Sequence, residues 1–433
     1  MVKVTTGRRA KDDRMMTETP QLIPALNMTP CQATALASLE SKDKPNVFLT
    51  GGAGVGKSFL IRHFQRGLDP KEFPMLASTG AAAVLVGGRT FHSFFGLGIL
   101  DGGPEATIER ACRNRQVVKR IRQVKGMVID EISMLAGPVL RVAEIICRRI
   151  RENDQPWGGL RIIAVGDFAQ LPPVERDPAK GGGWAFLDPV WEWSAFERQM
   201  LQTQVRCQDP EYMNVLSKIR QGVVDDDVTE YLNARTGDVE ADFAGTRLFP
   251  RRDQTELFNE ARLAELPGEE KKFETISSGN ARGVETLLKQ APIPQTLRLK
   301  EGALVMIRQN DPMGRWVNGS TGYVRKIQPA RLSIELLNGR KVEIDKATFS
   351  LLDGEGEILA ALVNFPVNLA WASTIHKAHG STLDRLAVDL SRLWEPGQAY
   401  VALSRLTSGS ELRIARWDPK SIRVDPKVIE FLK

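Results

Sequence analysis

The chain has 433 residues, and 59 lysines and arginines against 53 acidic residues give it a net charge of +6. Its 42% hydrophobic and 26% charged residues are typical of a globular protein of two to four domains, which excludes collagen-like, low-complexity and wholly disordered chains. The weak basic balance permits nucleic acid as a partner and does not require it, and no apolar run approaches the ~20 residues of a membrane span.

The first elements in chain order predict a parallel α/β sheet. Residues 1–27 form a polar arm without the apolar core of a secretory signal. A helix then begins at Thr29, with Pro30 in its first turn. Short apolar strands separated by helical stretches follow, as a parallel sheet covered on both faces requires. These strands are expected at residues 47–50, 75–78, 126–130 and 161–165.

The second half of the chain has a different pattern. Short strands between residues 300 and 365 are broken by Asn318-Gly319 and Asn338-Gly339, and Asn-Gly is the favoured hairpin-turn dipeptide. We therefore expect a small antiparallel β-barrel inserted in the chain. The α/β pattern resumes after it, with strands at residues 387–390 and 411–414.

A glycine-rich loop supplies the strongest chemical signal. Residues 51–58 fit GxxxxGK[ST] directly after an apolar strand and before a helix. In such a loop, backbone N–H groups and the positive helix end face the phosphates, Lys57 reaches the β and γ groups, and Ser58 can bind Mg²⁺. The other predicted nucleotide contacts in the loop are Gly52, Gly54, Val55 and Gly56.

A pair of acids ends a later apolar strand. Asp130 is placed to hold Mg²⁺, and Glu131 to orient or deprotonate the attacking water. An exposed acidic strand end is the alternative for this segment alone. Gln170, in the loop at residues 166–173, is a neutral residue that can contact a γ-phosphate.

Together these segments resemble the Pif family of helicases, in the RecD-like branch of superfamily 1B. The resemblance runs from Thr29 to Ile414 with the family's motifs in order. It implies ATP and Mg²⁺ as cofactors and two RecA-like domains with ATP in the cleft between them. The matched segments are residues 29–32 for the adenine-reading motif, 78–82 and 90–93 for the first DNA motifs, 130–134, 140–159, 166–173, 205–206, 371–377 with 380–382, and 400–405.

The resemblance also assigns individual residues. Gln32 would read adenine, and Arg206 and Arg405 would meet the γ-phosphate from the second domain, although a surface salt bridge is the alternative for each arginine. His379 departs from the family, which more usually has Gln there, and Cys31 and Cys207 stand where it more usually has polar residues. The implied contacts with single-stranded DNA are Thr79, His92, Ser93, Thr374, His376 and Lys377.

The histidine pair at residues 376 and 379 leaves one alternative open. Its spacing matches one helical turn, so the two imidazoles could bind a metal ion, but no third ligand is nearby in the sequence. The four cysteines contain no CxxC pair, which argues against zinc and against a disulfide framework.

Most of the net charge lies in one segment. Residues 108–125 hold seven basic residues and one acid, while their apolar positions approximate a helical stripe. We expect one face to pack and the other to lie near a single-strand/duplex junction, with Arg115 and Lys119 contacting DNA. A solvated basic face is the alternative.

The sequence therefore predicts an ATP-dependent DNA helicase of α/β class, translocating 5′ to 3′ and unwinding duplex, with G-quadruplexes or RNA–DNA hybrids as further substrates. Alternatives are a RecD-like translocase subunit that needs partners and a non-motor phosphate-loop switch.

Roles in DNA repair, recombination and telomere maintenance are expected. So are a monomer when free and a cytoplasmic location associated with a bacterial or phage nucleoid or, in a eukaryote, the nucleus or mitochondrion. The expected units are an arm (1–27), a RecA-like domain 1A (28–200, with a 1B wedge at about 94–125) and a RecA-like domain 2A (201–433, with an SH3-like 2B barrel at about 296–365).

Overall fold

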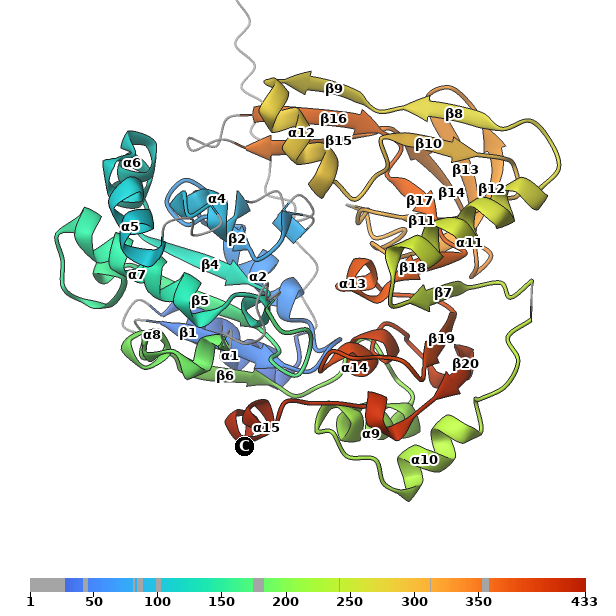
Figure 1. Cartoon of the computed structure of the whole chain (residues 1–433), viewed down its shortest axis with the longest axis horizontal. Helices are drawn as coiled ribbons and strands as arrows, with labels where there is room; N and C mark the ends of the chain where they lie inside the picture. The colour runs from blue at the N-terminus through green and yellow to red at the C-terminus, as the bar shows by residue number, and fades with distance from the viewer. Residues whose placement is uncertain are drawn as a thin grey trace, which may run out of the picture.

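A computed structural model describes residues 28–41, 46–80, 82–83, 89–98, 103–173, 183–240, 242–311, 313–352 and 358–433. The predicted arm, residues 1–27, lies outside these ranges. Figure 1 shows two lobes side by side, the amino-terminal half of the chain on the left and the carboxy-terminal half on the right. In the described ranges, no helix is long and apolar enough to cross a membrane.

The first lobe is built on a six-stranded sheet in the order β3-β2-β4-β5-β1-β6, and every strand pair in it is parallel. The predicted parallel sheet is therefore confirmed. Its strands are β1 (Val47–Gly51), β2 (Met75–Ala77), β3 (Arg89–Thr90), β4 (Gly126–Asp130), β5 (Arg161–Gly166) and β6 (Glu197–Leu201). Its helices are α1 (Pro30–Glu40), α2 (Lys57–Gln65), α4 (Phe91–Phe95), α5 (Gly103–Arg113), α6 (Arg115–Gln123), α7 (Gly137–Arg151) and α8 (Pro189–Trp193).

Strand β1 shows why this sheet needs helices on both faces. Side chains alternate across a strand, and Val47 and Leu49 pack into one apolar cluster whereas Phe48 packs into another. All five residues of β1 are buried. The helix at its amino-terminal side begins as predicted, because Thr29 caps α1 in a reciprocal pair of hydrogen bonds with Gln32.

The second lobe has a smaller parallel sheet in the order β18-β7-β19-β20. With the first sheet it gives the chain two parallel-sheet cores of the RecA-like kind. Its strands are β7 (Thr246–Phe249), β18 (Ala372–Thr374), β19 (Leu386–Leu390) and β20 (Leu412–Trp417). The helices of this half are α9 (Pro210–Arg220), α10 (Asp226–Asn233), α11 (Arg252–Glu265), α12 (Ala281–Gln290), α13 (Ile375–Ala378), α14 (Gln398–Leu403) and α15 (Pro426–Leu432).

Antiparallel strands lie above this sheet in Figure 1. Five of them form a sheet in the order β14-β13-β12-β11-β17, and β13 and β14 are joined through Gly339 with a φ of 83°. The remaining antiparallel strands form two further sheets, β15-β16-β9 and β10-β8. These sheets include β8 and β9, which precede residue 296, where the predicted barrel begins. The bounds are β8 (Lys271–Glu274), β9 (Ile276–Gly279), β10 (Thr296–Leu299), β11 (Leu304–Ile307), β12 (Thr321–Ile327), β13 (Arg331–Leu336), β14 (Lys341–Asp345), β15 (Ala347–Leu352), β16 (Ile358–Asn364) and β17 (Val367–Leu369).

The end of the chain crosses back to the first lobe. Helix α15 follows β20 of the second lobe, yet the Phe431 ring stacks on Phe186 with centroids 4.2 Å apart. Trp184 Nε1 donates to Asp425 Oδ2 at 2.7 Å, and Arg198 donates to the last two backbone carbonyls of α15 at 3.4 and 3.1 Å. The lobes are thus joined by two stretches of chain, one after β6 and one before α15.

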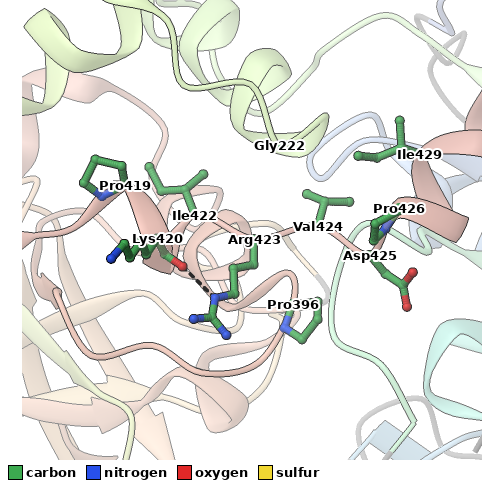
Figure 2. Close-up of a pocket in the computed structure, with 10 residues that line it drawn as sticks. All are labelled: Gly222, Pro396, Pro419, Lys420, Ile422, Arg423, Val424, Asp425, Pro426 and Ile429. Atoms are coloured by element: carbon green, nitrogen blue, oxygen red, sulfur yellow. Dashed lines mark hydrogen bonds between the residues drawn. The ribbon is translucent and has the colours of Figure 1, made fainter. Parts of the chain in front are cut away.

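A cavity of ≈650 Å³ lies where this segment leaves the second lobe, beside Gly222 and Pro396 (Figure 2). Within the segment, Arg423 Nε donates to the Lys420 carbonyl at 2.6 Å, and Gly397 N donates to the Arg423 carbonyl at 2.9 Å. None of the residues predicted to bind nucleotide lines this cavity. The predicted nucleotide site therefore lies outside this cavity, at the phosphate loop of residues 51–58.

Candidate nucleotide and nucleic-acid site

The predicted phosphate loop, residues 51–58, joins β1 to α2 and packs against two other segments. Gly54 and Gly56 have φ angles of 84° and 90°, in the left-handed region that glycine enters without strain. A Cβ atom on Gly54 would lie 2.6 Å from Gln204 Oε1, and one on Gly56 would lie 2.5 Å from Gln32 Nε2. Backbone conformation and close packing both require glycine here.

The Lys57 side chain folds back over this loop. Its Nζ donates to the carbonyl oxygens of Gly51 and Gly52 at 2.8 and 3.0 Å. Burial lowers the pKa of Lys57, while the charges of Asp167 and Glu131 act in the opposite direction. The ammonium group is therefore held at the loop, between its carbonyls and a group of carboxylates.

Asp130 and Glu131 form the carboxylate pair at the end of β4. Glu131 has a φ of 52°, which costs a non-glycine residue on the order of 1 kcal/mol, so the surrounding structure must hold this turn. Its N–H donates to Asp130 Oδ1 at 3.0 Å. Burial and the charge of Glu131 raise the pKa of Asp130 to about 7, and burial raises that of Glu131.

These raised pKa values mean that the protein supplies too little positive charge for both carboxylates. A divalent cation bound by Asp130 would supply it. The hydroxyl group of Ser58, exposed in the first turn of α2, is the second oxygen ligand that the sequence predicts. The residues present therefore fit a magnesium ion.

Asp167 is a buried acid that the sequence analysis did not assign. It follows β5, and Arg220 of α9 donates to it from Nη2 to Oδ1 at 2.8 Å and from Nε to Oδ2 at 3.1 Å. Burial acts to raise the pKa of Asp167, but the charge and hydrogen bonds of Arg220 outweigh burial and lower it. This ion pair joins the two lobes. Its one sequence signal is an aspartate directly after an apolar strand.

Gln170 is held from both lobes. Its Nε2 donates to Asp167 Oδ2 at 3.4 Å, and its Oε1 lies 2.6 Å from His379 Nε2. The same imidazole nitrogen lies 3.6 Å from Glu131 Oε1. Burial lowers the pKa of His379 to about 3, with the charge of Arg405 acting in the same direction. His379, one of the positions at which the chain departs from the family pattern, thus belongs to the predicted nucleotide site.

Arg206 and Arg405 lie together beside the phosphate loop. Arg206 N donates to the Gly54 carbonyl at 3.2 Å, and its Nη1 to the Ser404 carbonyl at 3.1 Å. Arg405 is 2% exposed, and its Nε donates to the Val401 carbonyl at 2.8 Å. Burial lowers the pKa of both, that of Arg405 to about 9. Within the described residues neither pairs with a carboxylate, which favours an anionic ligand over the salt-bridge alternative.

Gln32 and Tyr400 hold the loop from opposite ends of the chain. Gln32 Nε2 donates to the Val55 carbonyl at 3.0 Å, and its Oε1 accepts from Thr29 N at 3.0 Å. Tyr400 Oη accepts from Ala53 N at 2.8 Å. Tyr400 lies in the matched segment 400–405, but its contact with the loop was not predicted, because the two residues are 347 positions apart.

The predicted DNA contacts of the first lobe lie around α4. Thr79 Oγ1 accepts from Ala82 N at 3.2 Å, at the start of a short helical turn. His92 is half-buried, and burial lowers its pKa, which leaves a neutral imidazole for hydrogen bonding or stacking. Ser93 is exposed.

The predicted DNA contacts of the second lobe lie on α13, across the lobe boundary from α4 (Figure 1). Thr374 is 6% exposed, and its Oγ1 caps the helix by accepting from Lys377 N at 3.1 Å. Lys377 is exposed, and His376 Nε2 lies 3.1 Å from Glu395 Oε2. His376 and His379 thus have separate partners. The described residues contain no group of three or more His, Cys, Asp and Glu placed to bind a metal ion.

The basic segment folds as two helices, α5 and α6. Asn114 separates them because its side chain accepts from Gln116 N and Val117 N, at 3.0 and 3.3 Å, and so starts a new helix. The predicted apolar stripe is nonetheless confirmed, since its main positions are buried. They are Ile108, Ala111, Val117, Ile121 and Val124.

Six of the basic side chains of this segment divide into three groups by their partners. Arg115 and Lys119 are exposed and make no ion pair with any residue that the structure describes. Arg120 connects α6 to α4, because its Nη1 donates to the Ser93 carbonyl at 3.3 Å. Three others already have acidic partners. These pairs are Arg113 with Glu109 (3.2 Å), Arg122 with Glu152 (3.4 Å) and Lys125 with Glu72 (2.7 Å).

The known proteins that this chain is similar to are PIF1-like helicases, as the sequence resemblance predicts. The family model described as PIF1-like helicase matches residues 30–230. The ATP-dependent DNA helicase Pif1 of Bdellovibrio bacteriovorus is 53% identical over 408 residues, which cover 94% of this chain and 92% of the relative.

Two solved structures of Pif1 from Bacteroides are also similar. The complex with ADP-AlF4 has a TM-score of 0.83 at 27% identity and covers 94% of this chain and 96% of its own. The complex with ADP-AlF3 and single-stranded DNA has a TM-score of 0.62 at 27% identity, with the same coverage.

Proposed function

Because the chain belongs to the PIF1-like helicase family and is an ATP-dependent DNA helicase, we propose that it moves 5′ to 3′ along single-stranded DNA and separates the duplex ahead of it. G-quadruplexes and RNA–DNA hybrids are further proposed substrates. The observation that carries the proposal is the pair Arg206 and Arg405. The Arg405 side chain is buried and that of Arg206 is half-buried, and both guanidinium groups lie beside the phosphate loop of the first lobe without a carboxylate partner in the described chain.

These arginines would make hydrolysis depend on the approach of the two lobes. The loop N–H groups of Gly52, Gly54, Val55 and Gly56 and the Lys57 ammonium would bind the phosphates of ATP from the first lobe. The guanidinium groups would then stabilise the charge that develops on the γ-phosphate. Gln32 would keep the loop in shape through Val55 and present its amide to adenine.

The acids of the site would act on the metal ion and on water. Asp130 and Ser58 would hold Mg²⁺, which when bound neutralises and polarises phosphate oxygens. Glu131 would orient the attacking water and accept its proton, because burial raises its pKa toward that of a useful general base. Gln170 would contact the γ-phosphate and register its loss.

Movement along DNA would come from alternating grip by the two lobes. Thr79, His92 and Ser93 would hold the strand from the first lobe. Thr374, His376 and Lys377 would hold it from the second, with Thr374 acting through its cap on α13. Duplex separation costs ~1.4 kcal/mol per stacked step, a modest load for each nucleotide advanced.

We further propose a division of the chain that follows these roles. Residues 28–200 form motor domain 1A and residues 201–433 form motor domain 2A. The α5–α6 segment, within residues 94–125, acts as a wedge near the junction, with Arg115 and Lys119 toward DNA. The SH3-like sheet at 296–365 flanks the strand. The protein acts as a monomer when free and serves DNA repair, recombination and telomere maintenance.

The test is ATP-driven unwinding by the purified protein on a panel of duplexes with a 5′ or a 3′ tail. We expect separation of the 5′-tailed duplex alone, and an ATPase rate that rises strongly on adding single-stranded DNA. An ATPase rate that does not change on adding single-stranded DNA would favour a nucleotide switch and contradict motor activity. Stimulated ATPase without unwinding would favour a translocase subunit that needs partners.

A further inference from the structure

His379 lies at the carboxy-terminal end of α13 and reaches two groups of the other lobe. Its Nε2 is 2.6 Å from Gln170 Oε1 and 3.6 Å from Glu131 Oε1. The His379 side chain is 10% exposed. Three residues earlier, on the same short helix, His376 is exposed. One helical turn therefore connects a predicted DNA contact with both groups that would act on the γ-phosphate and water.

The hydrogen bond to Gln170 has a defined direction. The Asp167 carboxylate beside Gln170 is ionised, since Arg220 lowers its pKa against the effect of burial. A carboxylate accepts hydrogen bonds only, so the amide NH₂ of Gln170 must face Asp167 and its oxygen must face His379. His379 Nε2 therefore carries a hydrogen and donates it.

His379 does this as a neutral group. Burial lowers its pKa to about 3, and the positive charges of Arg405 and Lys57 that face it act in the same direction. A protonated imidazole here would add a third cation to the two guanidinium groups. A neutral donor fixes the Gln170 amide without changing the charge that the nucleotide meets.

We propose that His379 is a positioning residue that transmits the grip of α13 on DNA to Gln170 and Glu131 across the lobe boundary. The inference rests on the proposed function, because it needs α13 to contact the strand. A side chain that both closes over Gln170 and extends from the DNA-contacting helix can align the amide only when the two lobes are together. Hydrolysis then becomes faster when DNA holds α13 in place.

The test compares His379→Phe, which keeps a ring but removes the donor, with His379→Gln, which restores an N–H donor. The assay is steady-state ATPase with and without single-stranded DNA, alongside ADP and DNA affinities. For His379→Phe we expect the DNA-stimulated kcat to fall about tenfold or more, with KM for ATP and both affinities changed less than about threefold. His379→Gln should recover kcat to within about threefold of the wild type.

A second arm asks whether the effect passes through Gln170. In a Gln170→Met background, His379→Phe should have little further effect on kcat, since the two side chains act as one unit. A kcat loss in the double variant equal to the product of the two single losses would overturn the proposal. Equal kcat losses in His379→Phe and His379→Gln, or a change confined to KM, would also overturn it. Thermal unfolding of each variant, expected near that of the wild type, separates misfolding from lost alignment.

The wild-type control separates this inference from the proposed function. If the wild-type rate ignores DNA, the proposed function fails, and the basal kcat of the two variants still decides whether His379 aligns Gln170. If DNA stimulates the wild type and His379→Phe alike, only the inference fails.

Discussion

In the nucleotide site, Arg405 is 2% exposed and Asp167 is fully buried, whereas Arg115 and Lys119 on α6 are exposed and unpaired within the described chain. Both regions hold charged groups that we propose face phosphates, those of ATP in the first region and those of DNA in the second. In the first, burial and near neighbours shift the pKa of nearly every charged group from its ordinary value. On α6, the side chains of Arg115 and Lys119 are exposed to water and dissolved ions.

The difference sets how strongly each region responds to substitution. A buried charge that loses its partner leaves an uncompensated charge in a medium that solvates it poorly, so single changes should have large effects that salt does not relieve. An exposed charge interacts through water, so its effect should be small, additive and dependent on ionic strength. Five predictions test this contrast, from the largest effect to the smallest.

Removing the phosphate-loop lysine should have the largest effect. Lys57→Ala should lower the ATPase rate by ~100-fold or more, because the loop loses its cation for the β- and γ-phosphates. Single-stranded DNA binding should remain. The control is Lys71→Ala, an exposed lysine on the same lobe, which should hydrolyse ATP like the wild type. ATPase activity that survives in Lys57→Ala would contradict the phosphate-loop assignment.

Breaking the ion pair between the lobes should be the second largest effect. Arg220→Met should destabilise the protein by about 3–5 kcal/mol at neutral pH, because Asp167 stays buried and charged without a partner. Denaturant unfolding measures the loss. The control is Arg113→Met, whose pair with Glu109 is exposed and should contribute less than about 0.5 kcal/mol. Equal losses in the two variants would break the comparison.

This pair also has a pH dependence of known sign. The wild-type pKa of Asp167 is lowered, so the pair's stability is present above the unfolded aspartate value and is lost as pH falls through the folded one. Without Arg220, burial would instead raise that pKa. The deficit of Arg220→Met should therefore shrink as pH falls from 7 toward 4, because Asp167 takes up a proton.

Reversing the unpaired charges of α6 should weaken DNA binding in a salt-dependent way. For Arg115→Glu with Lys119→Glu, we expect about tenfold lower affinity for a tailed duplex at low salt. The log–log salt slope should be smaller by about 1.4 if the two side chains face single-stranded phosphates, and by about 1.8 if they face duplex phosphates, because two side chains no longer neutralise phosphates. Titrations at several salt concentrations measure both. Lys427→Glu with Lys433→Glu makes the same change in charge on exposed lysines at the end of the chain and should leave the slope unaltered. Unchanged binding in the α6 variant would favour a merely solvated face.

Neutralising single charges on these helices should give the smallest effect. Arg115→Gln should lower DNA affinity by about twofold to threefold, whereas Arg113→Gln should change it less, because Glu109 already offsets Arg113. The same titrations compare them. A larger effect from Arg113 than from Arg115 would mean that internal pairing does not decide which charges DNA meets.

The nucleotide site shows which parts of a site can be predicted from sequence. Lys57, Asp130 and Glu131 were predictable because each belongs to a short motif at or directly after the end of a buried strand, where local pattern fixes its position. The contact between Gln170 and His379 joins residues 209 positions apart, and only the packing of the lobes brings them together. The contact between Arg220 and Asp167 spans 53 positions and crosses the same boundary.

The basic segment shows the same limit in local structure. The stripe of buried residues from Ile108 to Val124 was predicted, because burial follows the helical period. The break at Asn114 was not, since the apolar period continues across it while one side chain caps a new helix. A cap depends on a single side-chain rotamer, which hydrophobic spacing does not report.

The return of α15 to the first lobe constrains how this motor can move. Two stretches of chain join the lobes, and both lie in the lower half of Figure 1, while α12 lies at the upper edge. Two attachments on the same side of the molecule would act as a hinge. When one lobe rotates about the other, the displacement is therefore largest on the opposite side. The docking of Phe431 on Phe186 therefore limits the directions in which one lobe can turn relative to the other.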